Sequence, residues 1–172
     1  MKTKLLLAAC CGPCSTTAIE RLFPEYEITV LFWGNNLDTA DEYERRLHAL
    51  QTVNTALNGG RPMIIAPYEH IDLGNPTEPE GGARCEKCFT LRLSAAAKTA
   101  VQNGFELFAT TLTTSPHKNA DVINAIGERI ANKHKIKYLP TDFKQNGGFT
   151  RSVELSKRLH IYRQKYCGCR KM

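Results

Sequence analysis

No long hydrophobic run occurs in the sequence. The longest purely apolar stretch, residues 5–11, has seven residues, whereas a helix that spans a bilayer needs about 20. Only residues 5–9 are apolar before Cys10, and a secretion signal requires a core of roughly 7–15 apolar residues. These absences predict a cytoplasmic protein with no membrane partner. Its first apolar segment is predicted to be a buried strand rather than a lipoprotein signal.

Cysteine is too scarce for a disulfide scaffold, and repeats, low-complexity tracts and linkers are absent. Seven cysteines among 172 residues fall below the roughly 8–10% typical of small disulfide-rich proteins. Because their number is odd and no secretion signal precedes them, we expect reduced thiols with a chemical role. The length fits one domain, so residues 1–172 are predicted to form a single α/β domain with a basic C-terminal helix and a Cys-x-Cys tail.

Positive charge is concentrated at the C-terminal end. The chain has 23 Lys and Arg against 17 Asp and Glu, a net charge of +6. Residues 1–150 are neutral, so the whole excess lies in residues 151–172. The basic residues of that segment are Arg151, Lys157, Arg158, Arg163, Lys165, Arg170 and Lys171. Such a patch attracts phosphate-bearing partners, although a solvated helix without a partner has the same composition.

Strand-like and helix-like segments alternate along the chain. Strands are predicted at residues 4–9, 27–33, 62–66 and 105–111, with a fifth starting at 137–139. Helices are predicted at residues 15–23, 38–57, 84–103, 118–134 and 152–166, with Ser15 and either Asp38 or Thr39 as N-caps. Residues 67–83, rich in Pro and Gly, are predicted to be a loop. This order predicts a three-layer, Rossmann-like α/β fold whose mostly parallel five-stranded sheet carries helices on both faces.

Chemically active side chains follow the predicted strands. Ligands of parallel α/β sheets bind beyond the carboxyl ends of the strands, so we expect one rim to collect these residues. They are Cys10, Cys11, Cys14, Asn35, Asn36, Cys85, Cys88, Thr113, Ser115, His117 and Asp142.

The cysteines form three groups and none stands alone. The groups are Cys10-Cys11-x-x-Cys14, Cys85-x-x-Cys88 and Cys167-x-Cys169. The C-x-x-C spacing lets two sulfurs converge on one metal, and a helix N-terminus favours the thiolate form that binds metal. A four-ligand zinc site would leave three cysteines unused, and a dithiol redox centre would explain only one group. An iron–sulfur cluster with a second metal or substrate site accounts for more of them, so metal binding is favoured over burial as small apolar residues.

Further motifs extend from these cysteines along nearly the whole chain. They are Glu42-Tyr43-x-x-Arg46-Leu47, Pro79-Glu80-Gly81-Gly82-Ala83-Arg84-Cys85-x-x-Cys88-Phe89-x-x-Arg92-Leu93, Thr110-Thr111-Leu112-x-x-Ser115-Pro116-x-Lys118-Asn119, Asp142-Phe143-Lys144, Glu154-Leu155-Ser156-Lys157 and Tyr162-Arg163-Gln164-x-Tyr166-Cys167-Gly168-Cys169. With these motifs the sequence resembles the cobalamin-independent epoxyqueuosine reductases, the QueH family.

The resemblance implies an activity, a fold and two cofactors. The family removes the epoxide oxygen from epoxyqueuosine at the wobble position of tRNA, a two-electron reduction that completes queuosine biosynthesis. Its fold is similar to that of adenine-nucleotide α-hydrolases, with cysteines in place of the phosphate-binding loop. The implied cofactors are a [4Fe-4S] cluster and an adjacent mononuclear metal ion, expected to be iron, and the electron donor is unidentified. Two loops depart from the family pattern, at Gly34-Asn35-Asn36-Leu37 and at His117-Lys118, and both concern substrate contacts.

From this expected chemistry we form hypotheses for the roles of individual residues. Four cysteines are expected to hold the cluster and three the second metal. The expected proton donors are Asp142, Tyr162 and Tyr166, with His117 as a further candidate. The expected substrate or RNA contacts are Asn36, Arg84, Arg92, Ser115, Lys118, Lys157, Arg158, Arg163 and Gln164. Loop capping, core packing and structural ion pairs are the competing explanations for these residues. A zinc-stabilised RNA-binding module and a thiol oxidoreductase are the alternative functions.

Overall fold

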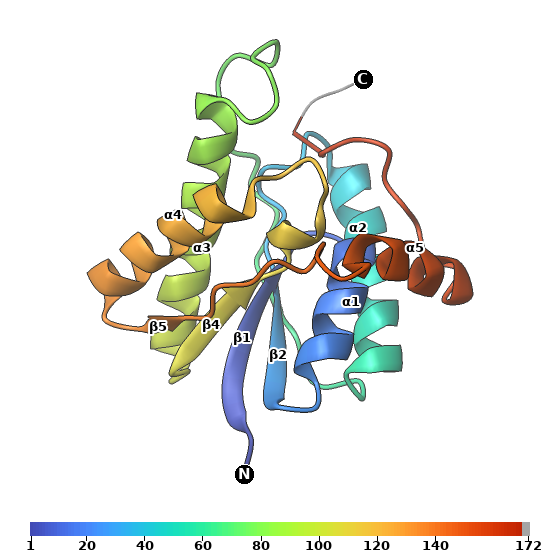
Figure 1. The fold of residues 1–172 in the computed structure, drawn as a ribbon. Helices are drawn as coiled ribbons and strands as arrows, with labels where there is room; N and C mark the ends of the chain where they lie inside the picture. The colour runs from blue at the N-terminus through green and yellow to red at the C-terminus, as the bar shows by residue number, and fades with distance from the viewer. Residues whose placement is uncertain (170–172) are drawn as a thin grey trace.

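A computed structural model describes residues 1–169 and contains a five-stranded sheet (Figure 1). The strands are β1 (Thr3–Ala9), β2 (Tyr26–Phe32), β3 (Ile64–Ile65), β4 (Leu107–Thr110) and β5 (Lys137–Tyr138). Their order is β3-β2-β1-β4-β5, and every pair of neighbours is parallel. This arrangement confirms the predicted Rossmann-like α/β fold. Basic residues Arg170 and Lys171 lie outside the described residues.

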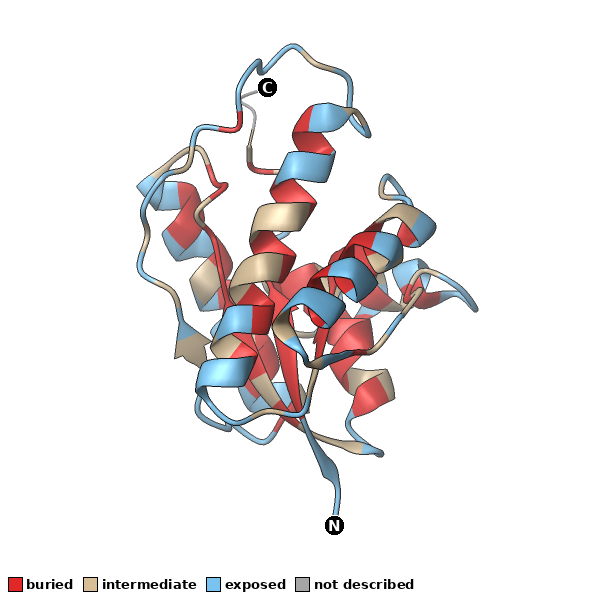
Figure 2. Ribbon diagram, turned by 90° about the vertical axis from the view of Figure 1, so that its left-hand side faces the viewer, coloured by how far each residue is buried: buried red, intermediate tan, exposed pale blue. Residues whose placement is uncertain are grey.

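Helices cover both faces of the sheet. They are α1 (Gly12–Leu22), α2 (Ala40–Leu57), α3 (Ala83–Gln102), α4 (Ala120–His134) and α5 (Gly148–Arg158), with a short 3-10 helix, η1 (Leu112–Thr114), after β4. Side chains alternate along β1, so that Leu5 and Leu7 face α1 and α2, whereas Leu6 faces α3 and α4. Figure 2 accordingly shows a buried sheet between helices that are exposed on their outer sides.

Helix α1 begins three residues earlier than predicted. Its N-cap is Cys11, and Pro13 occupies the first turn, where a missing N–H costs nothing. Ser15 is therefore not the N-cap: its hydroxyl donates to the Cys11 carbonyl at 2.7 Å. The predicted cap at Thr39 is confirmed, because its hydroxyl oxygen accepts from the Glu42 N–H at 3.1 Å.

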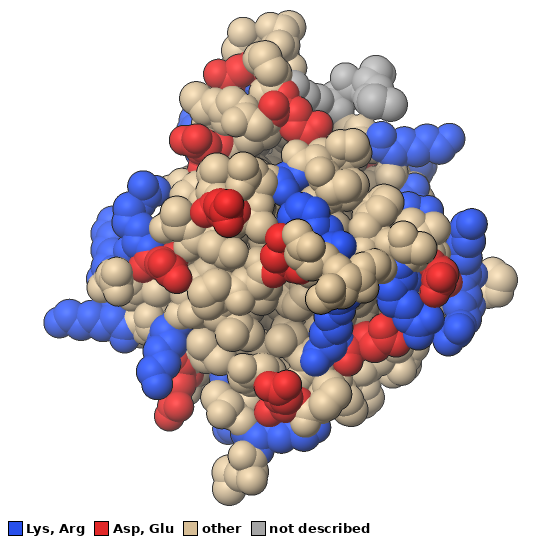
Figure 3. Space-filling view, in the orientation of Figure 1, with Lys and Arg blue, Asp and Glu red and all other residues tan. Residues whose placement is uncertain are grey.

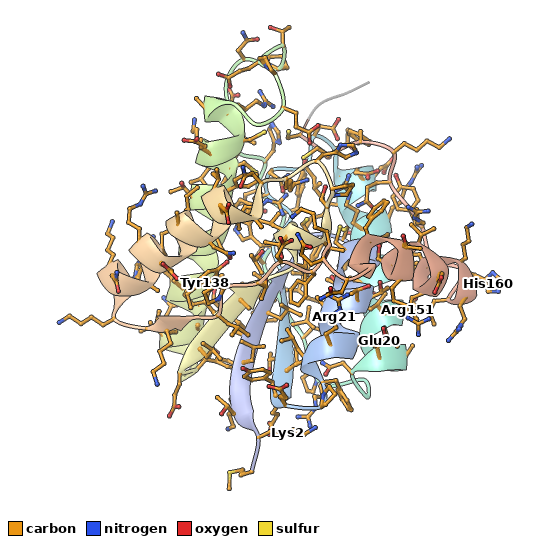
Figure 4. All side chains as sticks on the ribbon, viewed as in Figure 1. Lys2, Glu20, Arg21, Tyr138, Arg151 and His160 are labelled. Carbon is orange, nitrogen blue, oxygen red and sulfur yellow. The ribbon has the colours of Figure 1, made fainter. Side chains whose placement is uncertain are left out.

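The prediction of a helix over residues 152–166 is wrong. Helix α5 ends at Arg158, because His160 adopts a left-handed φ of 52° and turns the chain away. The N–H groups of His160 and Ile161 bond back to the carbonyls of Lys157 and Ser156, which is a Schellman motif. Figure 4 places His160 at this end of α5. Residues 159–169 form a tail with no regular helix or strand.

Helix α5 is fixed to α1 by polar contacts. The Arg151 guanidinium bonds both carboxylate oxygens of Glu20, at 2.7 and 3.0 Å, and the pair is labelled in Figure 4. The Thr17 hydroxyl donates to the Gly148 carbonyl at 2.9 Å. These contacts hold the start of the tail beside the carboxyl edge of the sheet.

Within the described residues no helix has the length and hydrophobicity needed to cross a bilayer.

Gly127 on α4 leaves space for the buried ring of Tyr138. A Cβ at this position would lie 2.5 Å from the ring, and the Tyr138 hydroxyl is fixed by donating to Asn124 at 2.8 Å. Overpacking against this fixed ring is expected to cost about 2–3 kcal/mol, the upper part of the usual range, whereas a helix favours Ala over Gly by about 1 kcal/mol. We therefore expect Gly127→Ala to lower the free energy of unfolding by about 1–2 kcal/mol. Urea denaturation measures it.

The matched control is Glu128→Ala, an exposed neighbour on the same helix. We expect it to change the free energy of unfolding by less than about 0.5 kcal/mol. Equal stability of Gly127→Ala and the wild type would contradict the packing argument.

Candidate functional site

The first cysteine group lies where β1 passes into α1. Cys11 has an extended backbone, and Gly12 allows α1 to approach α2, since a Cβ there would lie 3.0 Å from Ala49. The Thr114 hydroxyl donates to the Cys14 carbonyl at 2.9 Å and connects this turn to η1. The group is therefore held rigidly at the carboxyl edge of the sheet, as predicted.

The three thiols of this group interact with one another. The hydrogen bond with Cys11, followed by burial, raises the pKa of Cys10. The hydrogen bond from Cys11 lowers the pKa of Cys14 and outweighs burial. For Cys11 itself the contact with Cys10 lowers the pKa, but the contact with Cys14 and burial outweigh it and raise the pKa to about 11. Of the three, Cys14 is thus the one most readily ionised.

The second group lies in the first two turns of α3. Both Cys85 and Cys88 are buried. The Gly81 N–H donates to the Cys85 sulfur at 3.3 Å, and Arg92 Nε donates to the Cys88 sulfur at the same distance. Each of the two sulfurs thus accepts one N–H donor at the start of α3.

The third group lies on the tail and its two thiols share a hydrogen bond. That bond lowers the pKa of Cys167 despite burial, with help from the positive charges of Lys118 and Arg92. The same bond, followed by burial, raises the pKa of Cys169. Cys167 is therefore the more acidic of the two thiols. Sequence reasoning did not single out Cys167 as the acidic thiol, because its cationic neighbours come from distant helices and loops.

Main-chain contacts hold the tail over the sheet edge. The fully buried Arg46 donates from Nη1 to the Cys167 carbonyl and from Nη2 to the Tyr166 carbonyl, both at 3.0 Å. Its Nε pairs with Glu42 at 2.7 Å, and Glu42 also accepts from the Tyr162 hydroxyl at 2.9 Å. A single guanidinium thus connects α2 to the tail.

Two further contacts complete this attachment. The Asp38 N–H donates to the Gly168 carbonyl at 2.7 Å, and Arg84 donates to the Cys169 carbonyl at 2.7 Å. Gly168 has a φ of 104°, and a Cβ there would lie 2.4 Å from Leu37. Only glycine suits this position.

Cations from several elements converge on the three cysteine groups. Burial would lower the pKa of Arg92, but one sulfur from each group outweighs burial and raises it. Burial likewise lowers the pKa of Lys118, and the sulfurs of Cys167, Cys14 and Cys10 reverse the shift. The three groups therefore share one electrostatic environment, although the predicted rim contained only the first two.

The cysteines line two adjoining cavities. The larger, about 460 Å³, is lined by six of the seven: Cys10, Cys11, Cys14, Cys85, Cys167 and Cys169. A narrow one of about 40 Å³ is lined by Cys85, Cys88, Cys167 and Cys169. The larger volume lies in the range of small-molecule sites. Within residues 1–169, however, no three Cys, His, Asp or Glu side chains are already arranged to hold one metal ion.

The expected proton donors occupy different places. Tyr166 lines the large cavity and its hydroxyl donates to Asp38 at 2.9 Å. Tyr162 donates to Glu42, and Asp142 pairs with Lys144 at 2.9 Å; neither residue lines either of the two cysteine cavities. Burial would raise the pKa of Asp142, but hydrogen bonds from Lys144 and Gln145 outweigh it and lower that pKa. His117 is exposed and lines both cavities.

The expected RNA contacts separate into three sets. Ser115, Lys118, Arg163 and Gln164 line the large cavity. Lys157 and Arg158 are exposed on the last turn of α5, where Figure 3 shows basic side chains gathered on the right. Arg84, Arg92 and Asn36 are buried. The two arginines meet cysteines and the tail, so the structure places them inside the site rather than on a surface that faces RNA.

Three residues of the site received no role from the sequence. Glu42 and Arg46 belong to one of the sequence motifs. Their i,i+4 spacing on a predicted helix could have indicated that they form an ion pair. Phe149 lines the large cavity and carried no signal beyond its place near the start of a basic helix.

Comparison with known proteins gives consistent matches. A sequence model of the family described as "Epoxyqueuosine reductase QueH" matches residues 5–171. The epoxyqueuosine reductase QueH of Streptococcus pyogenes is 41% identical over 178 residues, which cover 98% of this chain and 70% of the relative. That of Staphylococcus epidermidis is 39% identical, covering 98% and 75%. That of Thermotoga maritima is 35% identical, covering 96% and 88%.

The Arg46 guanidinium acts as a clamp by holding the carbonyls of Tyr166 and Cys167. This clamp can be tested by removing the charge of Arg46. We expect Arg46→Met to lower the free energy of unfolding by about 3–5 kcal/mol, because the buried Glu42 loses its counter-charge. We also expect Cys167 and Cys169 to react faster with a thiol reagent in the metal-free protein.

The control is Arg61→Met. Arg61 pairs with Glu27 at 3.2 Å, but the two side chains are 43% and 39% exposed. Its loss should cost less than about 1 kcal/mol and leave thiol reactivity unchanged. Equal effects of the two substitutions would contradict the clamp.

Proposed function

The chain belongs to the epoxyqueuosine reductase QueH family, and we propose that the cysteine site described above is where it reduces the epoxide of epoxyqueuosine in tRNA. This is the final step of queuosine biosynthesis. Converting the epoxide to an alkene takes two electrons and two protons and releases the oxygen as water. The site must therefore bring together a source of electrons, a group that accepts the oxygen and a source of protons.

The observation that carries this proposal is the convergence of all seven cysteines on two adjoining cavities at the carboxyl edge of the sheet. Thiolates are the ligands that iron–sulfur clusters require. The cations Arg46, Arg92 and Lys118 lie among them and offset their negative charge. The donor set thus fits iron–sulfur chemistry, provided that the thiols rotate into a ligand arrangement.

We assign a [4Fe-4S] cluster to four of the seven cysteines and a mononuclear iron to the other three. When bound, these groups supply one-electron transfers and a Lewis acid for the epoxide oxygen. A zinc-stabilised binding module has no use for seven thiols, because a closed zinc site takes four ligands.

The protein itself supplies charge and protons. Lys118 lines both cavities, and Tyr166 lines the larger one, where its hydroxyl is held by Asp38. We propose these two as the groups that deliver protons to the departing oxygen. Asp142 is the weakest of the expected donors, because its ion pair with Lys144 stabilises the carboxylate.

The tRNA is proposed to lie across the end of α5 and the tail. Lys157 and Arg158 are exposed there, and Arg163 and Lys165 are exposed at the mouth of the large cavity. Phosphates bound to these side chains would orient the RNA, so that the modified nucleotide enters the cavity. An external electron donor is also required.

Cysteine replacement tests the metal assignment. We expect Cys88→Ser to lose both epoxide reduction and bound iron, because serine does not replace a thiolate ligand of a cluster. Iron and acid-labile sulfide are measured on anaerobically purified protein, with circular dichroism as the control for folding. A fully loaded and active Cys88→Ser protein would contradict this ligand assignment.

Salt dependence tests the RNA surface. We expect Lys157→Ala/Arg158→Ala to weaken tRNA binding and to make the slope of log K against log salt shallower by about 1.4, the value for two lost phosphate contacts. The control, Lys98→Ala/Lys133→Ala, removes two exposed charges from α3 and α4. An unchanged slope in the first variant would exclude this surface.

A further inference from the structure

We propose that the mouth of the large cavity binds the base of the substrate nucleotide, with the base stacked on Phe149 and its hydrogen-bonding edge on the amide of Gln164. The inference rests on the proposed function, because it specifies how the modified nucleotide is held while its epoxide reaches the cysteines. Both side chains line the cavity that contains six of the seven cysteines.

Phe149 is an exposed aromatic residue in the lining of the large cavity. In the described part of the chain the exposed large apolar residues are Met1, Phe23, Ile65, Val101 and Phe149. Of these only Phe149 lines the cysteine cavity, and it is 39% exposed. Single exposed apolar residues are common, so its position rather than its exposure is informative. Single-stranded RNA is commonly bound by stacking its bases on such rings.

The backbone under Phe149 is tightly fixed. Gly147 has a φ of 72°, and Gly148 passes so close to the Phe143 carbonyl that a Cβ would lie 1.6 Å from its oxygen. Thr17 holds the Gly148 carbonyl as described above. The ring is thus presented at the cavity by a rigid turn, and little ordering entropy is lost when a base stacks on it.

Gln164 supplies an unsatisfied polar group in the same cavity. Its Oε1 is buried and has no hydrogen-bond partner among the described residues. Buried polar atoms usually have partners, so this atom points to a ligand. A primary amide offers both an acceptor and donors, and the edge of a guanine-type base presents the complementary groups. Arg163 and Lys165 flank Gln164 and are exposed, as groups that bind the adjacent phosphates would be.

Kinetics on the holoenzyme test the stacking. We expect Phe149→Ala to raise KM for the epoxyqueuosine-containing tRNA by roughly 5- to 100-fold, with kcat, iron and sulfide content and the thermal midpoint unchanged. Phe149→Tyr should restore KM, because it keeps the ring. The matched control is Phe23→Ala, which removes a 40% exposed ring at the C-cap of α1 and should leave KM as it is.

Binding of an anticodon stem-loop identifies the group that Phe149 contacts. With an abasic nucleotide at the wobble position, the wild type and Phe149→Ala should bind equally, because no base is left to stack. With the base present, Phe149→Ala and Gln164→Leu should each bind more weakly than the wild type. An equal loss on abasic RNA, or an unchanged KM in Phe149→Ala, would overturn the proposal. If the wild type binds RNA but reduces no epoxide, the proposed function fails, and the abasic comparison still tests the base site.

Discussion

The buried guanidinium of Arg46 is the constraint on which the site depends. Residues 159–169 have no helix or strand to hold them, yet they carry two of the seven cysteines. Arg46 ties the carbonyls of Tyr166 and Cys167 to Glu42 on α2. A buried pair of this kind contributes little net stability against an apolar alternative, so its value lies in fixing where the tail lies. Cys167 and Cys169 thereby join the cysteines that follow β1 and begin α3.

Most of the fold was predictable because local patterns agree with the tertiary structure. Apolar β1 and β2 and the long helices α2 and α3 match the predicted ranges to within about two residues. The errors lie at the ends of helices and strands, which tertiary contacts determine. A basic amphipathic pattern continues beyond α5, but a left-handed His160 ends that helix. The third strand is reduced to Ile64 and Ile65, because pairing with β2 is limited to those residues.

The cysteines of the site could be predicted from the sequence, but the residues that surround them were harder to predict. Spacing identified three groups, and strand order predicted that the first two meet at one edge; the place of Cys167 and Cys169 was not predicted. Sequence shows that Arg84 and Arg92 are positive but not which way they point, and both are buried beside thiols or the tail. The roles of Arg46 and Phe149 depend on a tail and a turn that come together only in the folded chain. The motifs that carry the resemblance include Arg46 without explaining its role, and they do not include Phe149.

The central claim is that these thiols hold redox-active iron. Its most direct test is to purify the wild-type protein anaerobically and to measure iron, zinc, acid-labile sulfide and the visible spectrum on one sample. The account predicts about four to five irons and about four sulfides per chain, with broad brown absorption. One zinc per chain, with no sulfide or colour even after reconstitution with iron and sulfide, would contradict it.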